Sequence, residues 1–402
     1  MGDEGVGAPA PGRLLTMTTI SHDDRIAPTA PRRLDGPPAD ASATRASAPT
    51  APGGGADALP FSDRFLRMLN DAAAILMISV GHRTGLFDAM TRLAWASSEE
   101  IASEAALHER YVREWLSAMT VARIVEHDAV LRRFRLPPEH AALLTRAASP
   151  SNLASTAQFI GELARVEIPV VECFRKGGGV PYAGFRCFHD VMADESDQTV
   201  VAHLDERVLP LVPGLESRLA EGIDVLDIGC GRGRAIVALA VRFPSSRFVG
   251  YDLCADAIED ARRLAAPRGL SNVRFETRDV THLDEPGSYD LVTAFDAIHD
   301  QARPDIVLAA VRRALRPDGV FLMQDIRASS ELARNLDHPL GTYLYTISCM
   351  HCMTVSLAQG GLGLGTAWGE ELAVAMLREA GFADVSLHRI EEDITNNWYV
   401  AR

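Results

Sequence analysis

The chain reads Asp227-Ile228-Gly229-Cys230-Gly231-Arg232-Gly233 at its most informative point, where an acid precedes three glycines at every second position. The apolar pair Val225-Leu226 comes before this stretch, and the helix-forming run 235–240 comes after it. Glycines allow a backbone to turn sharply and to approach a ligand closely. The order therefore predicts a strand, a ligand-binding loop and a helix.

The spacing of the glycines distinguishes between kinds of ligand. A dinucleotide-binding loop reads G-x-G-x-x-G after its strand, whereas the third glycine here comes one residue too early. Asp227 also stands where it would repel a pyrophosphate. A ligand with positive charge and no phosphate fits better, and S-adenosylmethionine, which carries an ammonium and a sulfonium group, is such a ligand.

Further strands follow this loop and alternate with helical runs. The second predicted strand, 247–251, ends at Asp252, about 20 residues past the loop, where nucleotide-binding folds hold a ribose diol. The third ends near Asp279. Alternating strands and helices predict a parallel sheet with sites at the carboxyl ends of the strands. The later predicted strands are 272–276, 289–295 and 319–324.

Residues 215–402 resemble a class I S-adenosylmethionine-dependent methyltransferase on these motifs. The resemblance implies an α/β, Rossmann-like domain with a mostly parallel seven-stranded sheet, and S-adenosylhomocysteine as the product. It also implies that the loop cradles the methionine part, that Asp252 binds the ribose and that Asp279 meets the adenine amine. The implied cofactor-binding residues are Asp227, Gly229, Gly231, Asp252, Leu253, Asp279, Val280 and Phe295.

Composition limits the partners and the setting. The net charge of −14 and the isoelectric point near 5.3 argue against a nucleic acid bound through its phosphates. The six scattered cysteines show no paired disulfide framework, which favours a reducing, cytoplasmic setting. No apolar run approaches the roughly 18 residues that span a bilayer, so no membrane partner is expected.

Residues 1–60 contain no aromatic residue and nine of the 22 prolines. Such a segment cannot bury enough apolar surface to fold, so a disordered tail is expected. Met17 offers an alternative start, which leaves open whether residues 1–16 are translated.

Residues 61–147 follow the order helix, helix, helix, hairpin, which predicts a winged-helix domain. A helix start is expected at Ser97 with acids in its first turn. The hairpin is expected from 124–125 and 134–136. The helix over 108–119 carries an apolar face, which we expect to comprise Tyr111, Val112, Trp115, Leu116 and Met119.

This domain could bind DNA or a second copy of the chain. Its 11 arginines are balanced by 11 acids, which opposes DNA binding. The phrases 99–102 and 135–137 resemble the module that dimerises small-molecule O-methyltransferases of plants and bacteria. The resemblance implies a homodimer, although a ligand-sensing transcriptional regulator is the alternative from another class.

Two further segments are expected near a small-molecule acceptor. The helical connector, 148–214, contributes Tyr182 and His189 as candidate acceptor contacts. An insertion over about 326–368 contributes His338, Tyr345 and His351, and it would close the pocket over the strand ends. Each of these residues could instead belong to a packed core or the surface. Cys349 and Cys352 form a single CxxC pair, whose role stays open and which lacks the second pair of a zinc site, so no metal is expected.

His299 is the candidate catalytic residue. It follows the predicted strand 289–295, and the unperturbed pKa of histidine, near 6.5, suits proton removal from a hydroxyl acceptor. The stretch Ala297–Asp300 resembles the His-Asp stretch of winged-helix O-methyltransferases, in which the histidine is the general base. The continuation Gln301–Pro304 departs from that family's pattern, so a packing role remains the alternative.

Residues 61–402 are most similar to a group of actinobacterial winged-helix methyltransferases, on the stretches 297–301 and 351–359. The resulting hypothesis is an enzyme that methylates a small molecule, with a hydroxyl of a secondary metabolite as the expected acceptor. Thiol, nitrogen and metalloid acceptors stay open, and the sequence does not name the acceptor.

Overall fold

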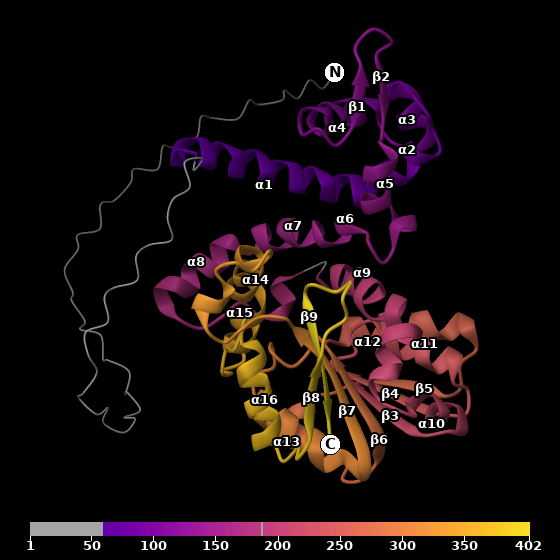
Figure 1. The fold of residues 1–402 in the computed structure, drawn as a ribbon, viewed down its shortest axis with the longest axis vertical. Helices are drawn as coiled ribbons and strands as arrows, with labels where there is room; N and C mark the ends of the chain where they lie inside the picture. The colour runs from indigo at the N-terminus through magenta and orange to yellow at the C-terminus, as the bar shows by residue number, and fades with distance from the viewer. Residues whose placement is uncertain (1–58, 186–187) are drawn as a thin grey trace, which may run out of the picture. The chain divides into compact units, whose positions relative to one another are not determined.

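The computed structural model describes residues 59–185 and 188–402, and residues 59–402 form one compact unit (Figure 1). The predictions for the tail lie outside the described residues except at its last two positions, and Cys187 also lies outside them. No helix within the described ranges is long and apolar enough to cross a membrane.

The front of this unit has the predicted order of elements. The helices and strands are α1 (Phe61–Thr84), α2 (Leu86–Thr91), α3 (Ser98–Glu104), α4 (Glu109–Val121), β1 (Glu126–Asp128) and β2 (Arg133–Arg135). Gly85, with a φ of 73°, ends α1 in a left-handed conformation that suits glycine. Ser97 and Glu100 cap α3 reciprocally, so the helix start expected at Ser97 is confirmed.

Trp115 anchors the core of this domain. Its ring is buried, contacts Phe87 edge-on and donates a hydrogen bond from Nε1 to the Met77 carbonyl at 2.8 Å. Two expectations are corrected here. Tyr111 is 79% exposed rather than buried, because it lies outside the face of α4 that packs into the core. Val112, Trp115, Leu116 and Met119 form that face. The first hairpin strand begins at Glu126, two residues later than expected, because 124–125 form the turn after α4.

The connector is helical, as predicted. Within 148–214 it contains α6 (Leu153–Thr156), α7 (Gln158–Arg165), α8 (Glu167–Lys176) and α9 (Phe188–Thr199). Helix α5 (Pro138–Leu144) precedes it in the front domain, and α10 (Leu215–Glu221) follows it. Helix α1 packs along α6 and α7, which joins the front domain to the connector.

A seven-stranded sheet forms the second half of the chain. Its strands are β3 (Asp224–Ile228), β4 (Arg247–Asp252), β5 (Val273–Thr277), β6 (Tyr289–Phe295), β7 (Leu315–Ile326), β8 (Val385–His388) and β9 (Asn396–Ala401). The strand order is β5-β4-β3-β6-β7-β9-β8, and only β9 pairs antiparallel to its neighbours. The mostly parallel Rossmann-like sheet is therefore confirmed.

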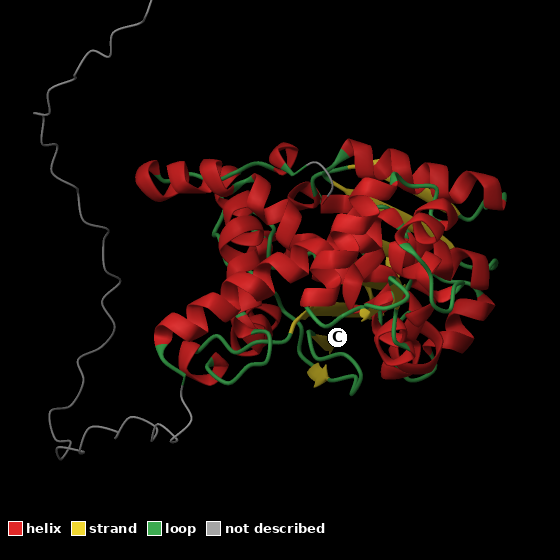
Figure 2. Ribbon diagram, turned by 90° about the horizontal axis from the view of Figure 1, so that it is seen from above, coloured by secondary structure: helices red, strands yellow, loops and turns green. Residues whose placement is uncertain are grey.

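Helices cover both faces of this sheet (Figure 2). On one face α10, α11 (Arg234–Arg242) and α12 (Ala255–Ala265) contribute to a common apolar core, and on the other face α13 (Pro304–Ala314) and α16 (Gly369–Glu379) do so. The carboxyl ends of the parallel strands are left free of these helices, and this is where such folds bind ligands.

The insertion between β7 and α16 folds into two short helices, α14 (Gly341–Ile347) and α15 (Met353–Ala358), joined by a π-helical turn over Ser348–Cys352. It packs against the connector. Phe159 and Phe188 of the connector share an apolar cluster with Ile347 and Val355 of the insertion. The backbone N–H of Val180 also donates to Thr354 Oγ1 at 2.8 Å.

Candidate active site

The glycine loop turns back over the end of β3, as predicted. Gly229, Gly231 and Gly233 all have positive φ values, of 64°, 51° and 73°. A Cβ at Gly229 would lie 2.4 Å from the Ala297 side chain, whereas a Cβ at Gly231 would meet nothing within 4 Å. The loop is therefore packed closely on one side and open on the side of the cavity.

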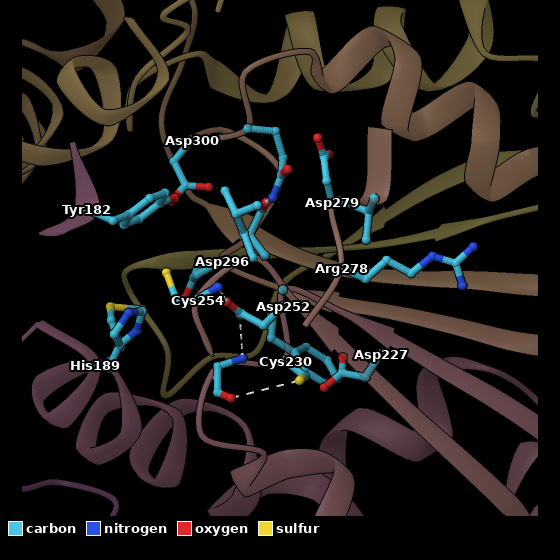
Figure 3. Close-up of a pocket in the computed structure, with 18 of the residues that line it drawn as sticks. Tyr182, His189, Asp227, Cys230, Asp252, Cys254, Arg278, Asp279, Asp296 and Asp300 are labelled. Carbon is cyan, nitrogen blue, oxygen red and sulfur yellow. Dashed lines mark hydrogen bonds between the residues drawn. The ribbon is translucent and has the colours of Figure 1, made fainter. Parts of the chain in front are cut away.

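Asp252, at the end of β4, ties this loop to the next one. Its Oδ2 accepts the backbone N–H of Gly231 and its Oδ1 accepts that of Cys254, both at 2.8 Å (Figure 3). Burial raises the pKa of this carboxyl group, and the two backbone hydrogen bonds oppose the shift. Each oxygen keeps a lone pair that a ribose diol could use.

Asp227 lies deeper, at 2% exposure, beneath the loop. Thr293 donates its hydroxyl to Asp227 Oδ1 at 2.7 Å. Burial raises the pKa of Asp227 to about 7, and the nearby Asp252 carboxylate adds to the rise. A cationic group in the cavity would be favoured beside this acid.

The loops after β3, β4, β5 and β6 enclose a cavity of about 520 Å³. Asp279 lines it and also caps the turn Val280–His282 by accepting the Thr281 N–H at 2.9 Å. Tyr182 and His189 line it from the connector (Figure 3). All eight residues expected to bind the cofactor line this cavity: Asp227, Gly229, Gly231, Asp252, Leu253, Asp279, Val280 and Phe295. Their individual roles stay predictions.

His299 follows β6 and lies in a second, apolar pocket beside the first. It is 4% exposed, and its Nδ1 lies 2.9 Å from Asp325 Oδ1. The same Asp325 oxygen accepts the Trp368 Nε1–H at 2.9 Å and the Ile326 N–H at 2.8 Å. Burial by itself lowers the pKa of His299, but the Asp325 carboxylate overrides this and raises it well above the ordinary value.

The second pocket touches the first through shared lining residues, which are Phe188, Met192, Asp296 and Asp300. His351 lines it from the insertion and is fully buried. The prediction that the insertion and connector together enclose a space over the strand ends therefore agrees with the pocket lining.

The structure places two predicted acceptor contacts elsewhere. His338 and Tyr345 line neither pocket. His338 Nδ1 accepts the Leu340 N–H at 3.1 Å, and the Tyr345 hydroxyl accepts a hydrogen bond from Asn335 at 2.9 Å. Both side chains serve the local fold of the insertion.

Several residues of the site were missed in the sequence. Glu195 and Asp296 line the second pocket, Asp325 contacts His299 and Trp368 contacts Asp325, and no motif singles these residues out. The one available signal was for Asp296, since an acid directly after a buried strand falls at the carboxyl end of the sheet.

One group of side chains among the described residues could hold a metal ion. The donor atoms of His189, Cys254 and Asp256 lie within 4.8 Å of one another. The expectation that the protein needs no metal stays a prediction.

Comparison with known families agrees with this architecture. A family model described as an Rv2258c-like winged HTH domain matches residues 72–146, and a methyltransferase domain model matches residues 219–381. The second match contains the glycine loop, Asp252, Asp279 and His299. The chain therefore carries a winged HTH domain followed by a methyltransferase domain.

Individual relatives of this methyltransferase cover it to different extents. The fatty-acid O-methyltransferase of Mycolicibacterium smegmatis is 36% identical over 107 residues, which is 27% of this chain and 38% of the relative. The methyltransferase ungE' of Aspergillus campestris is 24% identical over 294 residues, 68% of this chain and 81% of the relative. The first match therefore spans well under half of the relative.

Solved structures share the fold over most of the chain. Human N-acetylserotonin methyltransferase in complex with SAM has a TM-score of 0.61 at 16% identity, and the match covers 87% of this chain and 99% of that one. The mitomycin 7-O-methyltransferase has a TM-score of 0.59 at 17% identity, with 85% and 98% covered. At these identities the likeness shows the fold alone.

The cavity of this methyltransferase fits S-adenosylmethionine. The open side of Gly231 leaves room for the methionine part beside the loop. The acids Asp227 and Asp252 suit a ligand that carries an ammonium and a sulfonium group and a ribose. When bound, the cofactor supplies an activated methyl group, and the chain's own residues orient it toward the acceptor.

Proposed function

We propose that this methyltransferase transfers the methyl group to a hydroxyl of a small molecule in secondary metabolism, with His299 as the general base. The observation that carries the proposal is the placement of a buried His299–Asp325 pair in an apolar pocket that shares Asp296 and Asp300 with the cofactor cavity. A hydroxyl must lose its proton as it attacks the methyl group, and a histidine beside it can accept that proton.

The roles of the pair follow from its geometry. Asp325 holds Nδ1 of His299, which leaves Nε2 as the nitrogen that can take a proton. Trp368 fixes the Asp325 carboxylate from the insertion side. Asp325 is thus a positioning residue that sets both the orientation and the basicity of His299.

The pH dependence of turnover tests this proposal. We expect the ascending limb of the pH–rate profile to lie above 6.5, the ordinary histidine pKa, because Asp325 raises the pKa of His299. The base acts only when unprotonated, so the rate rises as pH passes upward through that raised pKa. The Asp325→Asn variant should move the limb to lower pH. A native limb below 6.5 would contradict the proposal.

The relatives do not identify the acceptor, because their names range from fatty-acid to nocamycin O-methyltransferase. Thiol and nitrogen acceptors would need less help with proton removal.

The proposal includes a reducing, cytoplasmic location. It is supported by the described cysteines, all of which are free: Cys173, Cys230, Cys254, Cys349 and Cys352.

We also propose that the front domain binds a second copy of the chain rather than DNA. The arginines of α4 and of strand β2 are already paired with acids, as Arg113 is with Glu109 and Arg135 with Glu126. Such pairs oppose a continuous positive surface for phosphates. In contrast, α1 exposes a row of large apolar side chains: Phe61, Phe65, Leu66, Met68, Leu69 and Leu76.

A double substitution on α1 tests the dimer. Sedimentation of the native protein should give a dimer, and Leu66→Asp with Leu69→Asp should give a monomer, because two charges would enter the apolar contact. Arg67→Asp, on the same helix, is the matched control and should stay dimeric. A native monomer at micromolar concentration would overturn the proposal, and a nanomolar DNA complex at physiological salt would favour a regulator.

A further inference from the structure

The pocket around His299 has a chemical character of its own. Its walls are mostly aromatic and aliphatic, with Phe159 and Phe188 from the connector and Tyr343 and Ile347 from the insertion. Phe159 contacts Phe188 edge-on, with ring centroids 5.8 Å apart. Walls of this kind suit a flat, apolar ligand such as an aromatic ring.

The charges in this pocket are strongly one-sided. Glu195, Asp296 and Asp300 line it, and none of the described residues that line it is a lysine or an arginine. Asp300 accepts the Tyr182 hydroxyl at 2.6 Å, and Glu195 accepts that of Thr156 at 3.3 Å. Neither partner is a cation, and the positive group that acts on Asp296 and Asp300 is His299, which is itself paired with Asp325.

Negative charge is already disfavoured in this pocket. Burial raises the pKa of Glu195 to about 7, and the nearby acids Asp393 and Asp194 add to the rise. Burial and the Asp325 carboxylate raise the pKa of Asp296 well above its usual range. The cationic form of His299 is already paired with Asp325. A ligand carboxylate would add negative charge where burial and neighbouring acids already disfavour it, and no lysine or arginine among the described lining residues would compensate.

Three polar side chains that line the pocket have buried atoms without a hydrogen-bond partner. These atoms are Oδ1 of Asp296, Oδ1 of Asn396 and both ring nitrogens of His351. Asp296 is also held at a φ of 51°, which is uncommon for a residue other than glycine. Its backbone N–H donates to the Gln324 carbonyl at 3.0 Å, which holds it in that place.

His351 is held in a fixed orientation. Its ring stacks on Phe188 with centroids 3.4 Å apart at 11°, and Phe185 contacts it edge-on at 4.5 Å. Buried polar atoms without partners are costly unless a ligand completes them. The unpaired atoms of Asp296 and His351 are therefore available to hydrogen-bond with groups of a bound acceptor.

We propose that this pocket selects aromatic acceptors whose second polar group donates a hydrogen bond, as a hydroxyl or an ammonium group does, and that it rejects acceptors with a carboxylate. Asp296 and Glu195 discriminate by charge, and His351 pairs with a polar group on the ring. This inference rests on the proposed methyl transfer and names the substrate class of the same site.

Three matched catechols test the inference: dopamine, hydroxytyrosol and homoprotocatechuic acid, which end in an ammonium, a hydroxyl and a carboxylate. We expect kcat/KM for the carboxylate to be at least about ten-fold below that of the other two. Calorimetry on the complex of the protein with S-adenosylhomocysteine should give the same ranking of affinities, without any need for turnover. Equal values for the three compounds would overturn the proposal.

The Glu195→Gln variant tests the charge argument. It keeps the shape of the side chain, so the ratio between the ammonium and the carboxylate compound should fall about three- to ten-fold. Asp197→Asn is the matched control, since Asp197 lies on the same helix, lines neither pocket and should leave the ratio unchanged. An unchanged ratio in Glu195→Gln would remove Glu195 from the discrimination.

The failure of this inference can be told apart from that of the proposed function. If S-adenosylhomocysteine binds but none of the three catechols binds its complex, the aromatic acceptor class is wrong while the methyltransferase reading stands. If the catechols bind in the expected order without being methylated, the pocket chemistry stands and the proposed base and acceptor atom are wrong.

Discussion

Replacing His299 with alanine should lower turnover by about 10² to 10⁴, the usual cost of losing a general base, while affinity for S-adenosylhomocysteine should stay nearly unchanged. The separation is expected because His299 lines the second pocket, proposed to bind the acceptor, and not the first cavity. Single-turnover rates and calorimetry on the same preparation measure the two effects.

A second variant distinguishes loss of the general base from loss of folding in His299→Ala. Asp325→Asn removes the charge but keeps the size of the side chain, so it should also lower the rate while the protein stays folded. A fully active His299→Ala would move the base to His351 or to no residue at all. An inactive variant with weakened S-adenosylhomocysteine binding would instead place His299 at the cofactor.

Replacing Asp252 with alanine should weaken S-adenosylhomocysteine at least about ten-fold. Charge-assisted hydrogen bonds contribute roughly 1.5–3 kcal/mol, and ten-fold in affinity corresponds to about 1.4 kcal/mol. The structure adds a second reason: the carboxylate also holds the N–H groups of Gly231 and Cys254, so its loss loosens the cradle itself.

Calorimetry measures this effect, and Asp256→Ala is its matched control. Asp256 is exposed, lies in the first turn of α12 and lines neither pocket, so its removal should change the affinity less than about two-fold. If Asp252→Ala weakens binding less than about three-fold, the ribose lies elsewhere in the cavity.

The cofactor half of the site could be predicted from short stretches of sequence. Loop geometry depends on neighbours in the chain, and Gly229, Gly231 and Gly233 all adopt positive φ values, which glycine accommodates. Asp252 ends β4 and Asp279 follows β5, so a parallel sheet brings them to one edge. All the predicted cofactor residues consequently line one cavity.

The acceptor half could not be predicted to the same degree. The insertion has no sheet to fix its register, and its helical turns bring His351 into the pocket but leave His338 and Tyr345 outside. The apolar face assigned to α4 was one residue too wide, since Tyr111 points to solvent. Periodicity gives the direction of a side chain only to within part of a turn.

The sequence by itself determined the fold class, the order of the strands along the chain, the winged-helix pattern and the cofactor, because each depends on local spacing and backbone preference. Only the tertiary structure decided which side chains meet His299. Asp325, Trp368, Glu195 and Asp296 come from separate elements, and they meet because the insertion packs against the connector over the strand ends. Burial then raises the pKa values of Glu195 and Asp296, a property that no single segment carries.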